Sequence, residues 1–393
     1  MLDQIQLADG TSRVEIAEHT GLTPQTVSGI VRRLIDEGIV REDGARSSSG
    51  GKPRTVLRIN ADAGRAVGLH FDLVELACVV VDLLGRPLVT ARRPTPAGMD
   101  PVEVTAAMTG LVGEVLARAG VQRERVLGLG LASPGPIDQA RGEVISPPQL
   151  SHWTRVPLKQ MVADATNLPV TLDNDATAAA IGERWAGAGR GVANFAYFFL
   201  GTGVGGGLVL GHQVHRGGSM NAAEFGHTSI TDSGPECYCG NRGCLESLIN
   251  PAALVADAHR RLASGGESAL SGAFRRAPST VDHAALCRAA AAGDDLAGAV
   301  IGEAAERLAA VAVNVVNIVD VELIILGGHG IRHVEAQFRQ AVLRALGERA
   351  MARRIRQVDV ALSPLGDDAA VIGGAALVLH ATYSPQVSAL LAG

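Results

Sequence analysis

The sequence predicts a two-lobed α/β domain that follows a smaller N-terminal unit, residues 1–60. That unit contains two short helical patterns followed by a strand pattern, and from residue 61 strands and helices alternate. The strands gather in two groups, each accompanied by helices, which is typical of an α/β fold with two lobes and a ligand between them. At 393 residues the chain is long enough for two or three domains with a sizeable core.

Residues 13–40 have the layout of a helix-turn-helix. Arg13–His19 forms a short helical pattern and Thr20–Leu22 a glycine turn. Thr23 is a suitable N-cap for the next helix, with Pro24 at its first position. A strand begins after residue 38, and before it apolar side chains recur at helical spacing: Val27, Ile30, Val31 and Leu34. This order of elements predicts a DNA-binding helix-turn-helix.

A basic loop follows the second helix. Between Gly44 and the apolar strand Thr55–Ile59 the cations occur with no acid among them: Arg46, Lys52 and Arg54. A flexible basic tip of this kind is what a β-wing uses to contact DNA phosphates. In the usual docking, helical phase directs four polar side chains to the major groove: Gln25, Thr26, Ser28 and Arg32. The alternative is an exposed helical hairpin with a solvated linker.

Beyond residue 61 the periodicity predicts two clusters of strands. The first contains residues 66–71, 76–82, 88–93, 126–132 and 170–172, with a helix capped by Asp100. The second contains 194–200, 205–210, 213–215 and 322–326, the last of which follows a long apolar helix near 299–319. Residues 263–272 are expected to form a loose loop.

Three of the five cysteines lie within eight positions and a histidine precedes them, so the candidate metal ligands are His227, Cys237, Cys239 and Cys244. Three thiolates and one imidazole form a closed tetrahedral zinc site with no open position for a substrate. We therefore expect a structural Zn²⁺ that shapes a loop and presents the flanking Glu224 and Glu246 to a ligand. Clustered buried cysteines or a disulfide are the alternative.

Polar or glycine-rich turns stand at four strand ends: 133–136, 172–175, 201–207 and 327–330. Each alone is most simply a turn, but their order along the chain is a stronger signal. A Gly-Thr-Gly run can bring backbone N–H groups against a phosphate, here at Gly201, Thr202, Gly203 and Gly205. Asn174 places an amide beside Asp175, a candidate general base. Asp173 and Asp175 could instead serve only as caps of the following helix.

The composition argues against two classes of protein. A net charge of −5 excludes a basic nucleic-acid coat. The sequence shows no leader-like pattern and no apolar run long enough to span a bilayer. Together with the odd number of cysteines, these features predict a cytoplasmic protein with reduced thiols and no membrane partner. Cys78 and Cys287 are expected to be small buried hydrophobes.

Over essentially its whole length the chain resembles the ROK family of sugar kinases and sugar-responsive repressors. The resemblance rests on residues 133–138 (SPGPID), 174–176 (NDA), 201–207 (GTGVGGG), 224–227 (EFGH), 237–246 (CYCGNRGCLE) and 326–328 (LGG). It implies an actin-like, two-lobed sugar kinase fold and a homodimer or homotetramer. One lobe would be 61–178, completed by a C-terminal helix at 369–393, and the lobe with the zinc site would be 179–368.

The resemblance also implies roles for individual residues. A sugar or sugar phosphate would be held by Gly135, Asn174, Asp175, Glu224, His227 and Glu246. Asp175 would be the catalytic base that the family's kinases use. His227 would serve the metal through one ring nitrogen and the sugar through the other.

The chain departs from the family where its kinases admit ATP phosphates and magnesium. Those kinases carry Asp-x-Gly-Gly-Thr, whereas this chain has His70-Phe71-Asp72-Leu73-Val74. The acid, both glycines and the threonine are missing in register, and Leu73 and Val74 should block close phosphate approach. Asp72 could partly replace the missing acid, but it is offset from that position by two residues, about 6–7 Å along a strand. The glycine run at 201–207 would then survive as structure or as a weak phosphate site.

These features favour a transcriptional regulator, a repressor of carbohydrate-metabolism genes, that binds operator DNA and senses a sugar without being an enzyme. The sugar would favour one closure of the lobes and so alter the spacing of two DNA-binding units in the oligomer. The alternative is a bifunctional ATP-dependent sugar kinase of the glucokinase or N-acetylhexosamine kinase type. A further alternative is a zinc-stabilised scaffold without a ligand.

Overall fold

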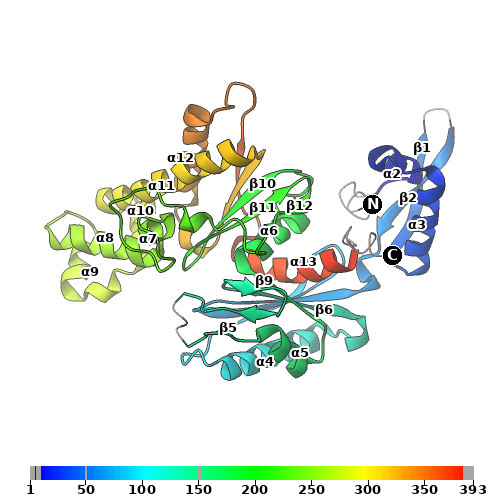
Figure 1. Ribbon diagram of the computed structural model, residues 1–393, viewed down its shortest axis with the longest axis horizontal. Coiled ribbons are helices and arrows are strands. Elements are labelled where there is room, and N and C mark those ends of the chain that lie inside the picture. The colour runs from blue at the N-terminus through cyan, green and yellow to red at the C-terminus, as the bar shows by residue number, and fades with distance from the viewer. Residues whose placement is uncertain (1–4, 6–9, 49–50, 149, 151, 384–393) are drawn as a thin grey trace. The chain divides into compact units, whose positions relative to one another are not determined.

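The computed structural model describes residues 5, 10–48, 51–148, 150 and 152–383 (Figure 1). The chain folds into two compact units. The first unit contains the described parts of Met1–Ala132, Leu158–Leu172 and Gly374–Gly393, and the second contains the described parts of Ser133–Pro157 and Asp173–Gly373. The lobes predicted at 61–178 and 179–368 differ from these units, because 133–157, 173–178 and 369–373 also fall in the second unit. The lobe boundaries stay a prediction.

The N-terminal segment confirms the winged helix-turn-helix. Ser12 caps α2 (Arg13–Thr20), and the Glu15 carboxylate accepts a hydrogen bond from the Ser12 backbone N–H at 2.8 Å. Thr23 caps α3 (Pro24–Asp36), as predicted. Strands β1 (Val40–Ser48) and β2 (Gly51–Ile59) pair as an antiparallel hairpin. Helices and hairpin share one small core: Ile5, Ile16, Val27, Val31, Leu34, Val40 and Leu57.

The first unit also contains a five-stranded sheet in the order β5-β4-β3-β6-β9. Its strands are β3 (Arg65–Phe71), β4 (Glu75–Val81), β5 (Pro87–Pro94), β6 (Val126–Ser133) and β9 (Val170–Asn174). β3 pairs with β4 antiparallel and with β6 parallel, and almost every residue of β3 and β4 is buried, as in a sheet covered on both faces. Helices α4 (Pro101–Ala119) and α5 (Leu158–Thr166) lie on one face (Figure 1), and Asp100 caps α4.

The second unit is built on a sheet in the order β12-β11-β10-β13-β14. Its strands are β10 (Phe195–Leu200), β11 (Val204–Leu210), β12 (Gln213–Val214), β13 (Leu323–Gly327) and β14 (Asp359–Leu362). Side chains alternate between its faces. Phe195 and Tyr197 pack with α6 (Asp175–Ala186) on one face, while Phe198 packs on the other in the core of α11 (Asp295–Val319) and α12 (Glu335–Arg349).

The remaining elements of the second unit are β7 (Ile137–Asp138), β8 (Glu143–Val144), α7 (Leu245–Ile249), α8 (Pro251–Ala263), α9 (Ser271–Arg276) and α10 (His283–Ala291). The loop predicted at 263–272 is confirmed only for 264–270, because α8 reaches its first residue and α9 takes its end. The elements that were not predicted are helices α5, α7, α8, α9, α10 and α12 and strands β7, β8 and β14. In the described part of the chain, no helix combines the length and the apolar character that a bilayer crossing requires.

Helix α13 (Ala369–Tyr383) contains a glycine pair that each unit uses for close packing. A Cβ at Gly373 would lie 1.8 Å from the Ala178 carbonyl oxygen in α6. A Cβ at Gly374 would lie 2.8 Å from the Gly130 carbonyl oxygen in β6. Glycine at both positions therefore allows two backbone contacts that any side chain would prevent.

Candidate metal centre and ligand site

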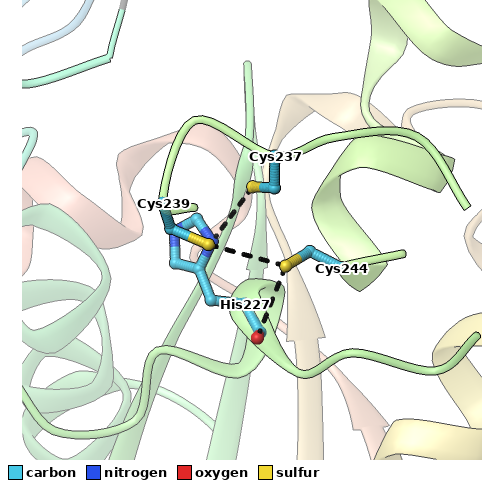
Figure 2. A group of neighbouring side chains, drawn as sticks. All are labelled: His227, Cys237, Cys239 and Cys244. Carbon is cyan, nitrogen blue, oxygen red and sulfur yellow. Dashed lines mark hydrogen bonds between the residues drawn. The ribbon is translucent and has the colours of Figure 1, made fainter. Parts of the chain in front are cut away.

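Four side chains of the second unit converge on one point: His227, Cys237, Cys239 and Cys244 (Figure 2). Their ligand atoms all lie within 4.8 Å of one another. The Cys237 Sγ lies 3.5 Å from the His227 Nδ1, and the Sγ atoms of Cys239 and Cys244 lie 3.6 Å apart. Ligand atoms at about 2.0–2.3 Å from a tetrahedral zinc are about 3.5–3.8 Å from one another. The cluster therefore fits a metal ion with little rearrangement.

Tight turns bring these ligands together. His227 ends a 3-10 turn (Phe225–His227), and Cys244 immediately precedes α7. Gly243 has φ 64°, and a Cβ there would lie 1.9 Å from the Thr231 carbonyl oxygen, so only glycine fits. The Cys237 N–H donates to the Asn241 carbonyl at 2.8 Å and closes the loop between the ligands. All five cysteines are free thiols, so the disulfide alternative is wrong.

The thiols differ in their environment. Burial raises the pKa of Cys237, and it raises the pKa of Cys244 to about 12. The Asn241 backbone N–H lowers the pKa of Cys239. A divalent cation at the centre of the cluster would stabilise all three thiolates, because it would be the largest charge nearby.

The second ring nitrogen of His227 faces Tyr238. The Tyr238 Oη lies 2.7 Å from the His227 Nε2, and the two rings meet edge to face with centroids 5.0 Å apart. Because Nδ1 points at the thiols, Nε2 is the nitrogen that remains for any other partner. Tyr238 was not among the residues predicted from the sequence, although its place between Cys237 and Cys239 is a signal that could have found it.

Two carboxylates lie beside this cluster. The Glu246 Oε2 accepts a hydrogen bond from the Val204 N–H at 2.8 Å. Gly203 leaves room for that carboxylate, since a Cβ there would lie 2.3 Å from Oε2. Glu224 has a solvent-accessible side chain, yet the surrounding protein removes enough water from its carboxyl to raise the pKa; His227 opposes the shift and Glu246 adds to it. Glu224 thus interacts electrostatically with both His227 and Glu246.

Asn174, rather than either neighbouring aspartate, is the N-cap of α6. Its Oδ1 accepts from the Ala176 and Thr177 N–H groups at 2.9 and 3.2 Å. Asp173 is buried in an ion pair with Arg216; burial raises its pKa and Arg216 opposes the shift. The Asp175 Oδ1 accepts from the Ala176 N–H at 2.8 Å. Gly135 lies beside Asn174, because a Cβ on Gly135 would be 3.0 Å from the Asn174 Nδ2.

The glycine run forms the turn of the β10–β11 hairpin and the start of β11. A Cβ at Gly205 would lie 2.7 Å from the Ala176 Cβ, and one at Gly207 would lie 2.4 Å from the Ala180 Cβ. These two glycines therefore let β11 pack closely on α6. Gly201 and Thr202 lie in the turn itself, with Gly203 beside Glu246. Packing on α6 and the contact with Glu246 therefore explain most of these glycines without a bound phosphate.

The segment 70–74 belongs to the first unit. His70 is a buried residue of β3, paired with Ala77 and Ala132 on the neighbouring strands. The Asp72 Oδ1 accepts from the backbone N–H groups of Val74 and Glu75 at 2.7 and 2.8 Å. One oxygen of the Asp72 carboxylate is therefore committed to the turn between β3 and β4.

The structure describes the side chains of five of the seven residues predicted to contact DNA. Four of them are exposed on α3, opposite its buried stripe: Gln25, Thr26, Ser28 and Arg32. The Arg54 Nη1 is 3.9 Å from the Glu15 Oε1. Arg46 and Lys52 lie in β1 and β2, but their side chains fall outside the described part of the structure. A hollow of about 740 Å³ beside α3 is also lined by Arg13 and Arg41, which were not predicted.

Comparisons with known proteins agree with this architecture. The ROK family profile matches residues 67–381, and a winged helix-turn-helix DNA-binding profile matches 1–41. The xylose repressor of Caldicellulosiruptor bescii is 29% identical over 371 residues, which are 94% of this chain and 91% of that protein. The crystal structure of a ROK family transcriptional regulator, a homolog of the Escherichia coli MLC protein, superposes with a TM-score of 0.79 at 26% identity over 95% of this chain and 92% of its own.

A kinase is also similar. The ROK family glucokinase from Streptomyces griseus, solved in complex with glucose and AMPPNP, superposes with a TM-score of 0.70 at 30% identity and covers 80% of this chain and 99% of its own. The profile match over most of the chain, the two-unit fold and the Cys₃His cluster lead to one assignment. The chain belongs to the ROK family, and its ROK domain follows a winged helix-turn-helix.

Proposed function

We propose that the protein is a sugar-responsive transcriptional repressor. One observation carries this proposal: a single chain combines two kinds of surface. The winged helix has an exposed polar face, and in the ROK domain carboxylates are grouped beside the Cys₃His cluster. Both regulators named above match more than nine-tenths of this chain, whereas the glucokinase matches 80% of it. The cytoplasm, where DNA and reduced thiols occur together, is the location that fits such a protein.

The test is a titration of the full-length protein on DNA from the region upstream of its own gene, followed by fluorescence anisotropy. Binding should weaken with salt, because phosphate contacts release counterions. D-xylose and D-glucose are the first sugars to add, given the names of the relatives. A DNA affinity that no sugar of a wider panel changes would reject the sugar response, and the lack of any salt-sensitive binding would reject the regulator.

The metal is proposed to be Zn²⁺ with a structural role. Three thiolates and an imidazole are the donors that zinc prefers, and four protein ligands leave no position for a reacting group. His227, Cys237, Cys239 and Cys244 would hold it. The ion would fix the loop that carries His227 and precedes Glu246, and would thereby keep both residues in place.

The sugar is proposed to bind in the second unit at Gly135, Asn174, Asp175, Glu224, His227 and Glu246. Support comes from two local groupings, Gly135 beside Asn174 and His227 with the two glutamates. Carboxylates and an imidazole N–H suit sugar hydroxyls, which both donate and accept hydrogen bonds. A phosphorylated sugar could use the Gly201–Gly203 turn. Binding would change the populations of conformations that differ in operator affinity.

The DNA contacts are proposed as two classes. Gln25, Thr26, Ser28 and Arg32 would read base edges, because all are exposed on α3. Arg46, Lys52 and Arg54 on the hairpin would contact phosphates. A homodimer or homotetramer would place two such units on adjacent half-sites.

A bifunctional ATP-dependent sugar kinase is the second candidate, favoured by the similarity to the glucokinase and by Asp175 beside Asn174. Against it, His70, Leu73 and Val74 stand where the family's kinases carry an acid, a glycine and a threonine, and Asp72 is engaged in a turn. Phosphoryl transfer needs both a positioned hydroxyl and a metal-bound phosphate in line with it. An assay of ADP release with a panel of hexoses decides: turnover that Asp175→Asn abolishes would establish the kinase.

A further inference from the structure

Tyr238 occupies the ring nitrogen of His227 that the proposed sugar site requires. When Nδ1 binds a metal, a neutral imidazole carries its single proton on Nε2, so this nitrogen can donate one hydrogen bond. The Tyr238 Oη, at 2.7 Å, is positioned to accept it. A sugar hydroxyl that uses Nε2 therefore has to replace the phenol.

The phenol also lies among the other polar groups of that site. The Glu246 and Glu224 carboxylates are close enough to act electrostatically on the phenol. A tyrosine hydroxyl ordinarily carries its proton at neutral pH. A protonated phenol can both accept from Nε2 and donate to a neighbouring oxygen, as a sugar hydroxyl does. Tyr238 thus offers the same hydrogen-bonding functions that a sugar would offer to His227.

The Tyr238 side chain borders solvent, into which it could rotate. It is 58% exposed, and the one ring contact that it makes among the described residues is the edge-to-face contact with His227. Its backbone is held on both sides, because Cys237 and Cys239 are metal-ligand candidates and the Cys237 N–H is hydrogen-bonded to Asn241. A rotation of the side chain would therefore open Nε2 without moving the metal centre.

We propose that Tyr238 is a gate on the sugar site: its phenol holds the His227 Nε2 in the free protein and rotates away when a sugar hydroxyl takes its place. This inference rests on the proposed sugar-binding role of His227. The gate reduces the apparent affinity by the fraction of molecules that are open. It also selects for ligands with a hydroxyl at this position, since a ligand without one would leave the Nε2 N–H without an acceptor.

The test is Tyr238→Phe in the full-length protein, with binding of D-xylose and D-glucose measured by calorimetry and stopped-flow mixing. Phenylalanine keeps the ring and removes the competing oxygen. We expect sugar affinity to rise roughly two- to twelvefold, the equivalent of one net hydrogen bond. The gain should come from faster association, with the dissociation rate unchanged. Zinc content, measured on the same samples, should equal that of the wild type.

Tyr197→Phe is the matched control, because it removes a phenol oxygen from the core of the same unit, on β10. Its sugar affinity should equal that of the wild type. Unchanged affinity in Tyr238→Phe would overturn the gate. So would weaker binding with faster dissociation, which would show that Tyr238 holds the bound sugar. If the wild type and both variants bind no sugar of the wider panel, the proposed sugar site fails first and the gate fails with it.

Discussion

Gly203 is a position where one methyl group should displace Glu246 and leave the fold intact. A Cβ on Gly203 would lie 2.3 Å from the Glu246 Oε2 and 3.1 Å from its Cδ, well inside the roughly 3.5 Å of a normal contact. The carboxylate is the free end of a flexible side chain, so it should move by roughly 1 Å. The backbone at Gly203 lies outside the left-handed region and accepts alanine.

Two losses follow in Gly203→Ala. The Val204 N–H loses its acceptor, which costs about 1–3 kcal/mol and should lower the melting temperature by roughly 2–12 °C. If Glu246 binds the sugar, the loss of this charged acceptor costs about 1.5–3 kcal/mol, or roughly 10- to 150-fold in affinity. Calorimetry with D-xylose and D-glucose measures the second effect, and thermal melts measure the first.

Gly218→Ala is the control, since no atom lies within 4 Å of a Cβ at that position. It should change neither sugar affinity nor melting temperature. The double variant Gly203→Ala with Glu246→Asp should regain part of the lost stability, because the shorter acid clears the new methyl group. A folded Gly203→Ala protein with wild-type sugar affinity would refute the assignment of Glu246 to the sugar.

Three further predictions concern the metal, DNA and pH. Cys239→Ser should lower the zinc content well below the expected roughly one ion per chain and abolish sugar binding, as atomic spectroscopy and calorimetry can show; full zinc occupancy in the variant would contradict the ligand set. Arg54→Ala should weaken binding to every DNA sequence and flatten the salt dependence by about one unit, whereas Arg32→Ala should cost about 1–3 kcal/mol at particular bases, measured by anisotropy on operator variants. Identical losses on all sequences would refute the distinction. Burial raises the pKa of Glu183, so the folded state binds this proton more tightly than the unfolded state and stability should fall as pH rises from the usual glutamate range through the raised pKa. Glu183→Gln should remove that dependence, so its gain in melting temperature should be present at neutral pH and vanish in acid; a gain independent of pH would contradict the burial of a charged Glu183.

Structural features that depend on residues close together in the chain could be predicted from the sequence. Thr23 and Asp100 cap their helices because a side-chain oxygen reaches N–H groups two or three residues along the chain. The residues of the Cys₃His cluster could be predicted because three of the four lie on one short loop. Helix α12 has no side-chain cap at its start, so its existence became clear only from its packing against α11. Helix α10 does begin with such a signal, the Asp282 cap, and it was missed.

The sequence by itself determined the winged helix, the two clusters of strands and the four residues of the Cys₃His cluster, since each depends mainly on neighbours in the chain. Only the tertiary structure decided what the long-range partners do. Glu246 accepts from Val204, 42 residues away, and Gly205 serves the packing of β11 on α6. The phenol of Tyr238 holds the His227 Nε2 because two turns bring the rings together. Such contacts depend on where the backbone places distant side chains, and no pattern of residue types along the chain encodes that placement.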